Sequence, residues 1–302
     1  MNKNRMTKLP VLYNRISKSI EQENTYKVDG LSFLYGTKLG KALTGSVINK
    51  RIVSTLYGQL VKSRNSIKQI PKFIEHYAIN TDEIKRPIDS FKSFNDFFIR
   101  ELKEGARPID TNENHLISPA DSRLFAFDLS KSKSLPVKGY WYNLNGLIKN
   151  KKLVNEYADG WCFIYRLAPS DYHRYCYVDD GQQEKVKRLR GVLHSVHPIA
   201  LSVTKSLISK NYRELTIMHT NSFGDVLQLE VGALLVGKII QHHKQPYSFV
   251  RGEEKGYFEF GGSTIIQLFK KGTIQIDSDI VEYSEKGIET LVRLGEKVGE
   301  KI

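Results

Sequence analysis

The amino-acid sequence predicts an α+β fold, with N-terminal amphipathic helices packed on a mainly antiparallel β core. The first observation is an apolar repeat of three to four residues over 39–60, which is the period of one helix face. The second is the change after Pro108 to short apolar segments separated by Gly, Pro and Asp. The third is a composition of 40% hydrophobic and 26% charged residues, typical of a folded chain. We therefore expect a helical region over 1–110 and a β-rich core over 111–302.

Two segments predict the helices. In the segment 39–60 the lysines and arginines fall mostly outside one apolar face, which consists of Leu39, Leu43, Val47, Ile48, Ile52, Leu56 and Leu60. A basic amphipathic helix can lie in a membrane interface, and it can equally pack on its own domain with its basic face solvated. The second segment, 93–102, begins at a Ser/Asn cap and ends before Gly105 and Pro108.

The β core is predicted from short segments at regular spacing, which indicate a sandwich or barrel-like arrangement. These segments are 161–167, 186–196, 214–219, 226–240 and 257–269. The last one is interrupted by Gly261-Gly262-Ser263-Thr264 between apolar residues that favour a buried strand. Glycine inside a strand usually marks a bulge, a bend or a close backbone approach.

The charge of the chain predicts an anionic partner. The formal net charge is +13, and residues 1–72 contain fourteen Lys and Arg against three Asp and Glu, a net of +11. The basic residues match no recognisable RNA- or DNA-binding motif and do not alternate with aromatics in a stacking pattern. We therefore expect an anionic membrane surface rather than nucleic acid, with 1–110 as the membrane-associating region.

The chain shows no sign of crossing that membrane. No apolar stretch approaches the roughly 20 residues of a span, and the basic N-terminus lacks the apolar region of a signal peptide. The two cysteines, Cys162 and Cys176, form no CxxC pair, which suits a reducing compartment. These features predict a peripheral protein on the cytoplasmic side of the cell membrane.

The Gly-Gly-Ser sequence at 261–263 allows a specific reaction. The hydroxyl of Ser263 can attack the carbonyl of Gly262 in an N→O acyl shift, which needs a distorted backbone and an uncrowded carbonyl. Consecutive glycines provide both. The same three residues can also form a simple bulge or tight turn, so the pattern alone leaves both interpretations open.

An ordered set of motifs resembles the phosphatidylserine decarboxylase family. The motifs are FNDFFIREL at 94–102, RPI at 107–109, SPAD at 118–121, DYHR at 171–174 and FGGST at 260–264. Three further segments fit the same family, namely FLYGTKLG at 33–40, FGD to VGA at 223–233, and RGEEKG at 251–256. The resemblance runs in order from about residue 33 to the end of the chain.

The resemblance implies a proenzyme that cuts itself between Gly262 and Ser263. Ser263 would end as a pyruvoyl group, a covalent cofactor, on a short α chain over 263–302, and the β chain would be 1–262. The pyruvoyl ketone would form a Schiff base with phosphatidylserine and accept the electron pair left by decarboxylation, giving phosphatidylethanolamine. The partners implied are phosphatidylserine and an α/β heterodimer of the two fragments, which could itself dimerise.

The resemblance also implies a charge relay of Asp121, His173 and Ser263, in which His173 takes the hydroxyl proton and Asp121 orients the imidazole. By residue type alone, His173 would be a core histidine and Asp121 a turn former. Many relatives have a second histidine three residues after the first, where this chain has Cys176, and glycine where it has Ser122. The remaining candidate for the base is His197.

Two other functions fit parts of the sequence. One is a catalytically inactive, basic membrane-binding protein of the same fold, and the other is a pyruvoyl decarboxylase that acts on a soluble amino acid. A metal site is not expected, because His194 and His197, three apart in a predicted strand, would point to opposite faces. The intact mass of the chain would separate a self-cleaving protein from an uncleaved one.

Overall fold

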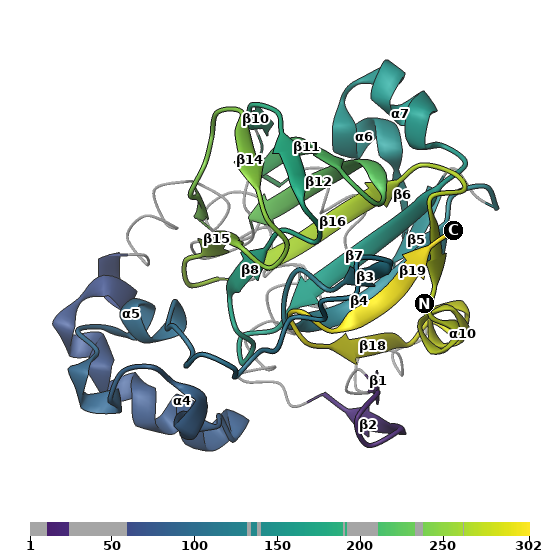
Figure 1. The fold of residues 1–302 in the computed structure, drawn as a ribbon. Helices are drawn as coiled ribbons and strands as arrows, with labels where there is room; N and C mark the ends of the chain where they lie inside the picture. The colour runs from purple at the N-terminus through teal and green to yellow at the C-terminus, as the bar shows by residue number, and fades with distance from the viewer. Residues whose placement is uncertain are drawn as a thin grey trace, which may run out of the picture.

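The computed structural model describes residues 11–23, 59–131, 134–137, 140–189, 191, 211–232, 238–261 and 263–302. The described part has a large mixed, mostly antiparallel sheet and a few helices before it in the chain, which confirms the predicted α+β class (Figure 1). The predicted helix over 39–60 lies outside the described residues except for its last two positions. No helix within the described part has the length and apolar character needed to cross a bilayer.

The main sheet joins distant segments of the chain. Its spatial order is β14 (Tyr247–Phe249), β9 (Gly181–Gln183), β11 (Arg213–Thr220), β12 (Gly224–Gly232), β16 (Ser263–Phe269), β7 (Trp161–Leu167), β4 (Ser122–Asp128), β18 (Glu289–Val292), β1 (Val11–Asn14) and β2 (Ser19–Gln22), and β10 (Lys187–Leu189) also pairs with β11. All neighbours are antiparallel except β1 and β18, which are parallel. Strands β1 and β2 come from the first 110 residues, so part of that segment belongs to the core sheet.

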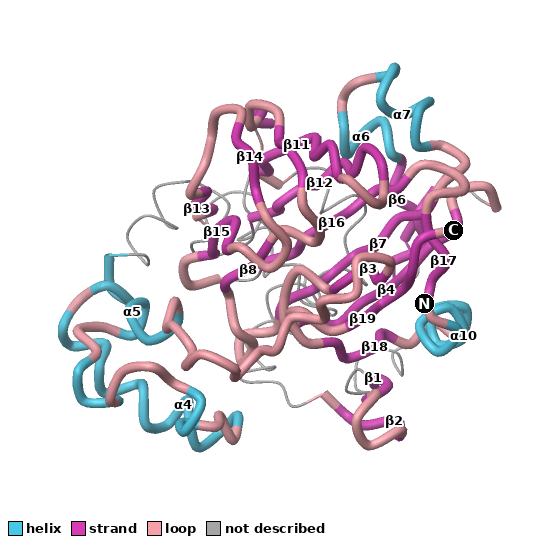
Figure 2. Tube along the Cα trace, in the orientation of Figure 1, coloured by secondary structure: helices cyan, strands magenta, loops and turns pink. Residues whose placement is uncertain are grey.

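Smaller sheets and helices surround the main sheet. The small sheets are β13 (Ile239–Gln241), β15 (Glu254–Phe258) and β8 (Arg174–Cys176); β17 (Ile274–Ile276), β19 (Lys297–Lys301) and β3 (His115–Ile117); and β5 (Ser134–Val137) with β6 (Tyr140–Asn143). The helices beside them are α6 (Leu144–Ile148), α7 (Lys151–Tyr157) and α10 (Ser278–Glu285). Figure 2 shows the strands gathered in one body, with most of the remaining helical structure to one side.

The strand predictions compare closely with this topology. The segment 161–167 is β7, 214–219 lies within β11, and 257–269 covers the end of β15 and all of β16. The segment 226–240 contains β12 and the start of β13, and 233–237 lies outside the described residues. Of the segment 186–196, the structure describes β10 and little more.

Strand β16 is the central strand that begins at the predicted cleavage site. Its first residue, Ser263, lies opposite Gly232 of β12 and Leu167 of β7. Every residue of β16 is buried, and alternate residues enter different apolar clusters, with Ile265 in one and Ile266 in the other. Because both faces of this strand are covered, its side chains are removed from water.

A helical lobe lies beside the sheets, at the lower left of Figure 1. It contains η3 (Arg64–Gln69), α4 (Ile70–Tyr77), η4 (Thr81–Glu83), η5 (Ile88–Ser90) and α5 (Phe94–Phe98). Its core consists of Val61, Ile70, Phe73, Ile84, Phe91, Phe94 and Phe97. Pro71 stands in the first turn of α4, where its missing N–H leaves no helical hydrogen bond unmade.

Helix α5 begins as predicted and ends earlier. The Ser93 hydroxyl accepts a hydrogen bond from the Asp96 amide, which confirms the cap. The helix stops at Phe98 rather than continuing to 102. The cause is tertiary pairing, because the Glu101 carbonyl accepts from the Lys85 amide and the Lys103 amide donates to the Glu83 carbonyl. These backbone groups are therefore used outside the helix.

Candidate active site

The predicted cleavage segment has an unusual backbone followed by an unpaired hydroxyl. Gly261 has φ of +148°, a value that residues with a side chain rarely adopt. Gly262 lies outside the described residues. Ser263 is fully buried, and its Oγ has no hydrogen-bond partner among the residues that the structure describes. A buried hydroxyl without a partner loses its hydrogen bonds to water and gains none from the protein. Such a group is uncommon in a folded protein, so it is a candidate for a role in the reaction.

The helical lobe holds the residues just before the two glycines. The Phe260 amide donates to Asn95 Oδ1 at 2.9 Å. The Phe260 ring packs edge-on against Phe94 and Phe98, with centroids 5.0 and 4.9 Å apart. The Lys62 ammonium lies 2.7 Å from the Glu259 carboxylate. Contacts from α5 and the start of the lobe thus fix the chain immediately before the predicted scissile bond.

His173 lies directly before β8 and is fully buried. Its Nδ1 is 3.0 Å from the Asp171 carbonyl oxygen, which can only accept, so we assign the ring proton to Nδ1. Nε2 is then an acceptor, and it is buried with no partner in the described part of the chain. Burial lowers the pKa of His173 to about 3, so the ring is neutral at pH 7.

His173 is also connected to the residues that precede the two glycines. Its carbonyl accepts from the Phe258 amide at 2.9 Å, and its ring centroid is 4.0 Å from that of Phe98. Phe98 in turn packs against Phe260. One aromatic ring therefore connects the histidine to the residues before Gly261. The described structure contains no hydrogen bond between His173 Nε2 and Ser263 Oγ.

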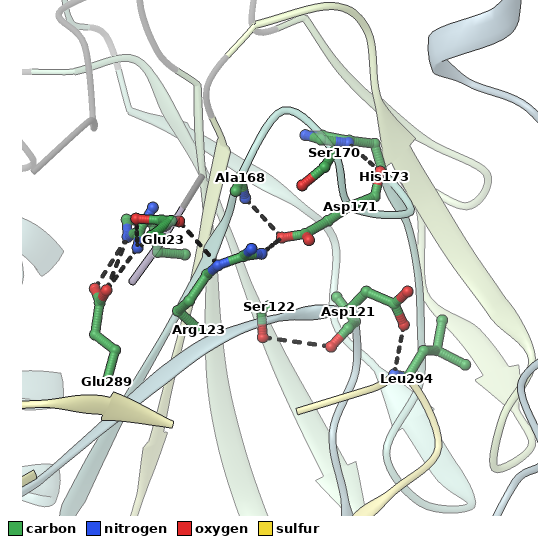
Figure 3. Close-up of polar contacts among 12 residues, drawn as sticks. Glu23, Asp121, Ser122, Arg123, Ala168, Ser170, Asp171, His173, Glu289 and Leu294 are labelled. Atoms are coloured by element: carbon green, nitrogen blue, oxygen red, sulfur yellow. Dashed lines mark hydrogen bonds and ion pairs between the residues drawn. The ribbon is translucent and has the colours of Figure 1, made fainter. Parts of the chain in front are cut away.

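Asp121 is held by other groups than His173. Its carboxylate accepts from Arg107 Nε at 2.9 Å, from Arg107 Nη2 at 2.7 Å and from the Leu294 amide at 2.9 Å. Figure 3 shows Asp121 pointing to Leu294, whereas the polar contact of His173 is with Asp171. The structure thus places Asp121 and His173 in separate hydrogen-bonded groups, and the relay between them stays a prediction.

A buried chain of ion pairs supports the loop that carries His173 (Figure 3). Arg123 Nη1 contacts the Asp171 carboxylate, and Arg123 Nε lies 2.9 Å from Glu23 without pointing its hydrogen at it. Arg166 continues the chain, at 2.9 Å from Glu23 and 2.6 Å from Glu289. Burial alone would raise the pKa of Glu23, but the two arginines lower it overall. Burial raises the pKa of Asp171 even with Arg123 beside it.

The residues that depart from the family pattern have structural positions. Cys176 is buried in the main apolar cluster, and burial raises the pKa of its thiol to about 12. The thiol is therefore protonated at pH 7 and cannot stand in for a second basic histidine. Ser122 is buried and donates to the Ala120 carbonyl at 3.3 Å. His197, the other candidate base, lies outside the described residues.

Four further residues lie around the predicted site, and their type and spacing gave no reason to assign them a role in cleavage or catalysis. They are Asn95, Arg100, Asp171 and Phe260. All four fall within motifs shared with the family, and that was the available signal. Their contacts depend on the docking of α5 and of the loop before β8 against β15 and β16, which no local pattern specifies.

Comparison with known proteins gives the family. The model of the family "Phosphatidylserine decarboxylase" matches residues 94–300. The chain belongs to the phosphatidylserine decarboxylase family. It is 42% identical over 292 residues to the phosphatidylserine decarboxylase proenzyme of Clostridium botulinum (strain Alaska E43 / Type E3), which covers 96% of this chain and 99% of that protein. It is 44% identical to the proenzyme of Clostridium novyi (strain NT), with the same coverage.

The relatives match along almost the whole chain. The phosphatidylserine decarboxylase proenzyme of Clostridium perfringens (strain ATCC 13124) is 44% identical over 291 residues, again 96% of this chain and 99% of the relative. The alignment therefore extends through the N-terminal segment and the helical lobe as well as the catalytic core. The resemblance noted in the motifs is confirmed at the level of the family.

Proposed function

We propose that this chain is cut between Gly262 and Ser263 and that Ser263 becomes the pyruvoyl group of the mature enzyme. The reaction class follows from the family: the protein is a phosphatidylserine decarboxylase proenzyme, a pyruvoyl-dependent carboxy-lyase with self-processing. The observation that carries the residue assignment is the Ser263 hydroxyl, which is fully buried, follows two glycines and has no hydrogen-bond partner within the described residues. A serine in an ordinary strand would not need this arrangement.

The self-cleavage balances with groups of this chain. Ser263 Oγ adds to the Gly262 carbonyl carbon, the C–N bond breaks, and an ester and a free amine result. Loss of the Ser263 Cα proton expels the Gly262 carboxylate and leaves dehydroalanine, whose hydrolysis releases ammonia and forms the pyruvoyl group. The +148° φ of Gly261 and the anchored Phe260 support this step, because both constrain the backbone before the attacked carbonyl.

His173 is the proposed base for the hydroxyl proton. It is neutral, its proton is on Nδ1, and its Nε2 can accept a proton because no described residue donates to it. We keep Asp121 as the residue that orients the imidazole. In that role, the Nδ1–H of His173 would donate to the Asp121 carboxylate instead of the Asp171 carbonyl. In the described structure the Asp121 carboxylate accepts hydrogen bonds from Arg107 and from the Leu294 amide. An Asp121→Asn variant that processes at the normal rate would remove Asp121 from the relay.

When present, the pyruvoyl group supplies an electron sink for the electron pair left at the substrate Cα as the carboxylate departs. The protein around Ser263 excludes water, because β16 is buried on both faces between β12 and β7. Exclusion of water strengthens the electrostatic interactions within such a site. His173, neutral and buried near the segment, can hold and release a proton at Nε2 in this setting.

The two fragments should stay together as an α/β heterodimer after cleavage. The α chain would contain β16, which is paired on one side with β12 and on the other with β7, both from the β chain. The α chain would also contribute β18 to the main sheet, between β4 and β1. Separation would expose these strands, so association is favoured by their backbone hydrogen bonds and buried side chains. Further dimerisation of the heterodimer stays a prediction.

We also propose that the protein acts as a peripheral enzyme on the cytoplasmic, anionic face of the cell membrane, with no nucleic-acid partner. The net charge of +11 over 1–72 supports this. On the helical lobe, Arg64, Lys68 and Lys72 are exposed and Leu60 is 65% exposed. Each Lys or Arg near an anionic surface contributes about 1 kcal/mol. High salt should therefore release the protein from anionic vesicles, and binding unaffected by salt would contradict the electrostatic part of this proposal.

The intact mass of the purified chain tests the processing proposal. Wild-type protein should give two fragments, 1–262 and 263–302, with the smaller one blocked by pyruvate at its N-terminus. Ser263→Ala should give one intact chain and no release of carbon dioxide from phosphatidylserine. A wild-type chain that stays intact, or one cut at another bond, would refute the assignment of Ser263.

A further inference from the structure

Arg100 is a buried arginine whose donors are mostly unused. It follows α5 and is only 4% exposed. Nη2 donates to the carbonyl oxygens of Ser170 and Asp171, at 3.1 and 3.4 Å. Nε and Nη1 are buried and have no hydrogen-bond partner within the described residues. The guanidinium therefore presents donors with no acceptor to receive them.

This state is costly for the charge that Arg100 carries. Burial lowers its pKa to about 10, although the nearby carboxylates of Asp121 and Asp171 act to raise it. The group is still protonated at pH 7, so a positive charge stands in the interior. A buried charge is usually paired with an opposite one. Arg107 and Arg123 each contact carboxylates, whereas Arg100 forms no ion pair with any residue that the structure describes.

The position of Arg100 is next to the proposed active site. Its Nη2 and the Nδ1 of His173 are directed to the same Asp171 carbonyl oxygen. The charge of Arg100 helps to lower the pKa of His173, after the larger effect of burial. Arg100 also follows Phe98, the ring that contacts both His173 and Phe260. Its free donors thus belong to the surroundings of the cleavage segment.

We propose that Arg100 binds the phosphate of the phosphatidylserine headgroup. The inference rests on the proposed function and names the group that positions its substrate. A guanidinium forms charge-assisted hydrogen bonds to phosphate oxygens. The Nε and Nη1 donors of Arg100 have no acceptor within the described residues, so each can donate to a phosphate oxygen. The bound phosphate would form the direct ion pair that Arg100 does not make with any described residue.

The headgroup also has a carboxylate, but that group is a poorer partner for Arg100. Decarboxylation removes negative charge from the carboxylate as carbon dioxide forms. A cation fixed on it would stabilise the substrate more than the transition state and would slow the reaction. The phosphate keeps its charge throughout, so a cation on it contributes binding without this penalty.

Cleavage itself offers a route for the headgroup to reach Arg100. Phe260 packs against α5, and cutting after Gly262 makes Phe260 the third residue from a free chain end. A chain end is held less firmly than a continuous segment. The residues that cover α5 in the uncut chain can therefore move when the mature enzyme forms.

Steady-state kinetics of Arg100→Gln in mixed micelles test the proposal. The variant should be cut into 1–262 and 263–302 like wild type, with KM for phosphatidylserine raised roughly ten- to hundredfold, the loss expected for a charge-assisted pair. Glycerophosphoethanolamine, which has the phosphate and no carboxylate, should inhibit wild type competitively and lose its effect by a similar factor in the variant. Arg100→Lys, which keeps the charge but has a single donor nitrogen, should fall between the two.

Arg188→Gln is the matched control, because it removes the same charge from an exposed arginine outside the region 1–110. Its KM should equal that of wild type. An unchanged KM and unchanged inhibition in Arg100→Gln would overturn the proposal. The proposal would also be overturned if the variant no longer responded to free serine, which has no phosphate, but was still inhibited by glycerophosphoethanolamine as strongly as wild type. If Arg100→Gln does not fold, an unchanged KM in Arg100→Lys overturns it instead. An uncut wild-type chain would refute the proposed function, which is a separate result.

Discussion

Replacing His173 with glutamine should make the fold less sensitive to acid. The reason is linkage: the pKa of His173 is about 3 in the folded chain, whereas an unfolded histidine titrates near 6.5. Between these two values the unfolded chain binds one more proton than the folded chain at this site. The free energy of unfolding therefore falls as the pH falls from about 6.5 towards 3.

The size of the effect follows from the two pKa values. Lowering the pH from 7 to 5 should reduce the free energy of unfolding by about 2 kcal/mol through His173 alone. Glutamine does not titrate, so a variant with glutamine at 173 lacks this contribution. The comparison is best made with Ser263→Ala as the parent, because the proposed cleavage cannot occur there and the molecule stays a single chain.

Urea unfolding at pH 7 and pH 5, followed by circular dichroism, measures the effect. The loss of stability between the two pH values should be about 2 kcal/mol larger in Ser263→Ala than in the double variant with His173→Gln. Equal losses in the two proteins would refute a neutral, buried His173. The self-cleavage rate of the wild type should also show no inflection near pH 6.5, where a solvated histidine base would titrate.

Three other substitutions test separate parts of the site. Asn95→Ala leaves the Phe260 amide without its acceptor, at a cost of about 1–3 kcal/mol, and should slow fragment formation on gels on the order of tenfold or more. Arg123→Met strands the buried Asp171 carboxylate and should lower the free energy of unfolding in urea by about 3–5 kcal/mol. Gly261→Ala places a side chain at φ of +148° and should cost about 1–3 kcal/mol in the same assay. A normal cleavage rate in the first variant, or unchanged unfolding in the other two, would contradict these assignments.

Several elements could be predicted because they depend on local pattern. The strand 161–167 has a bounded apolar sequence, and it is β7 in the structure. The cap at Ser93 depends on a hydroxyl placed before a helical run, and the Asp96 amide uses it. The end of α5 was predicted too late, because the backbone of 101–103 pairs with 83–85, which are distant in sequence. Helix propensity and capping depend on neighbouring residues, so they do not indicate a backbone pairing with a distant segment.

The sequence by itself determined the family, the α+β class and the Gly-Gly-Ser segment, because these depend on ordered motifs and short-range periodicity. Only the tertiary structure decided which groups meet. It gave His173 the Asp171 carbonyl as its partner, paired Asp121 with Arg107, and buried Arg100 with two nitrogens that no described residue accepts from. The physical reason is that burial and hydrogen-bond partners come from segments that are remote in the chain and meet only when the sheet and the lobe pack together.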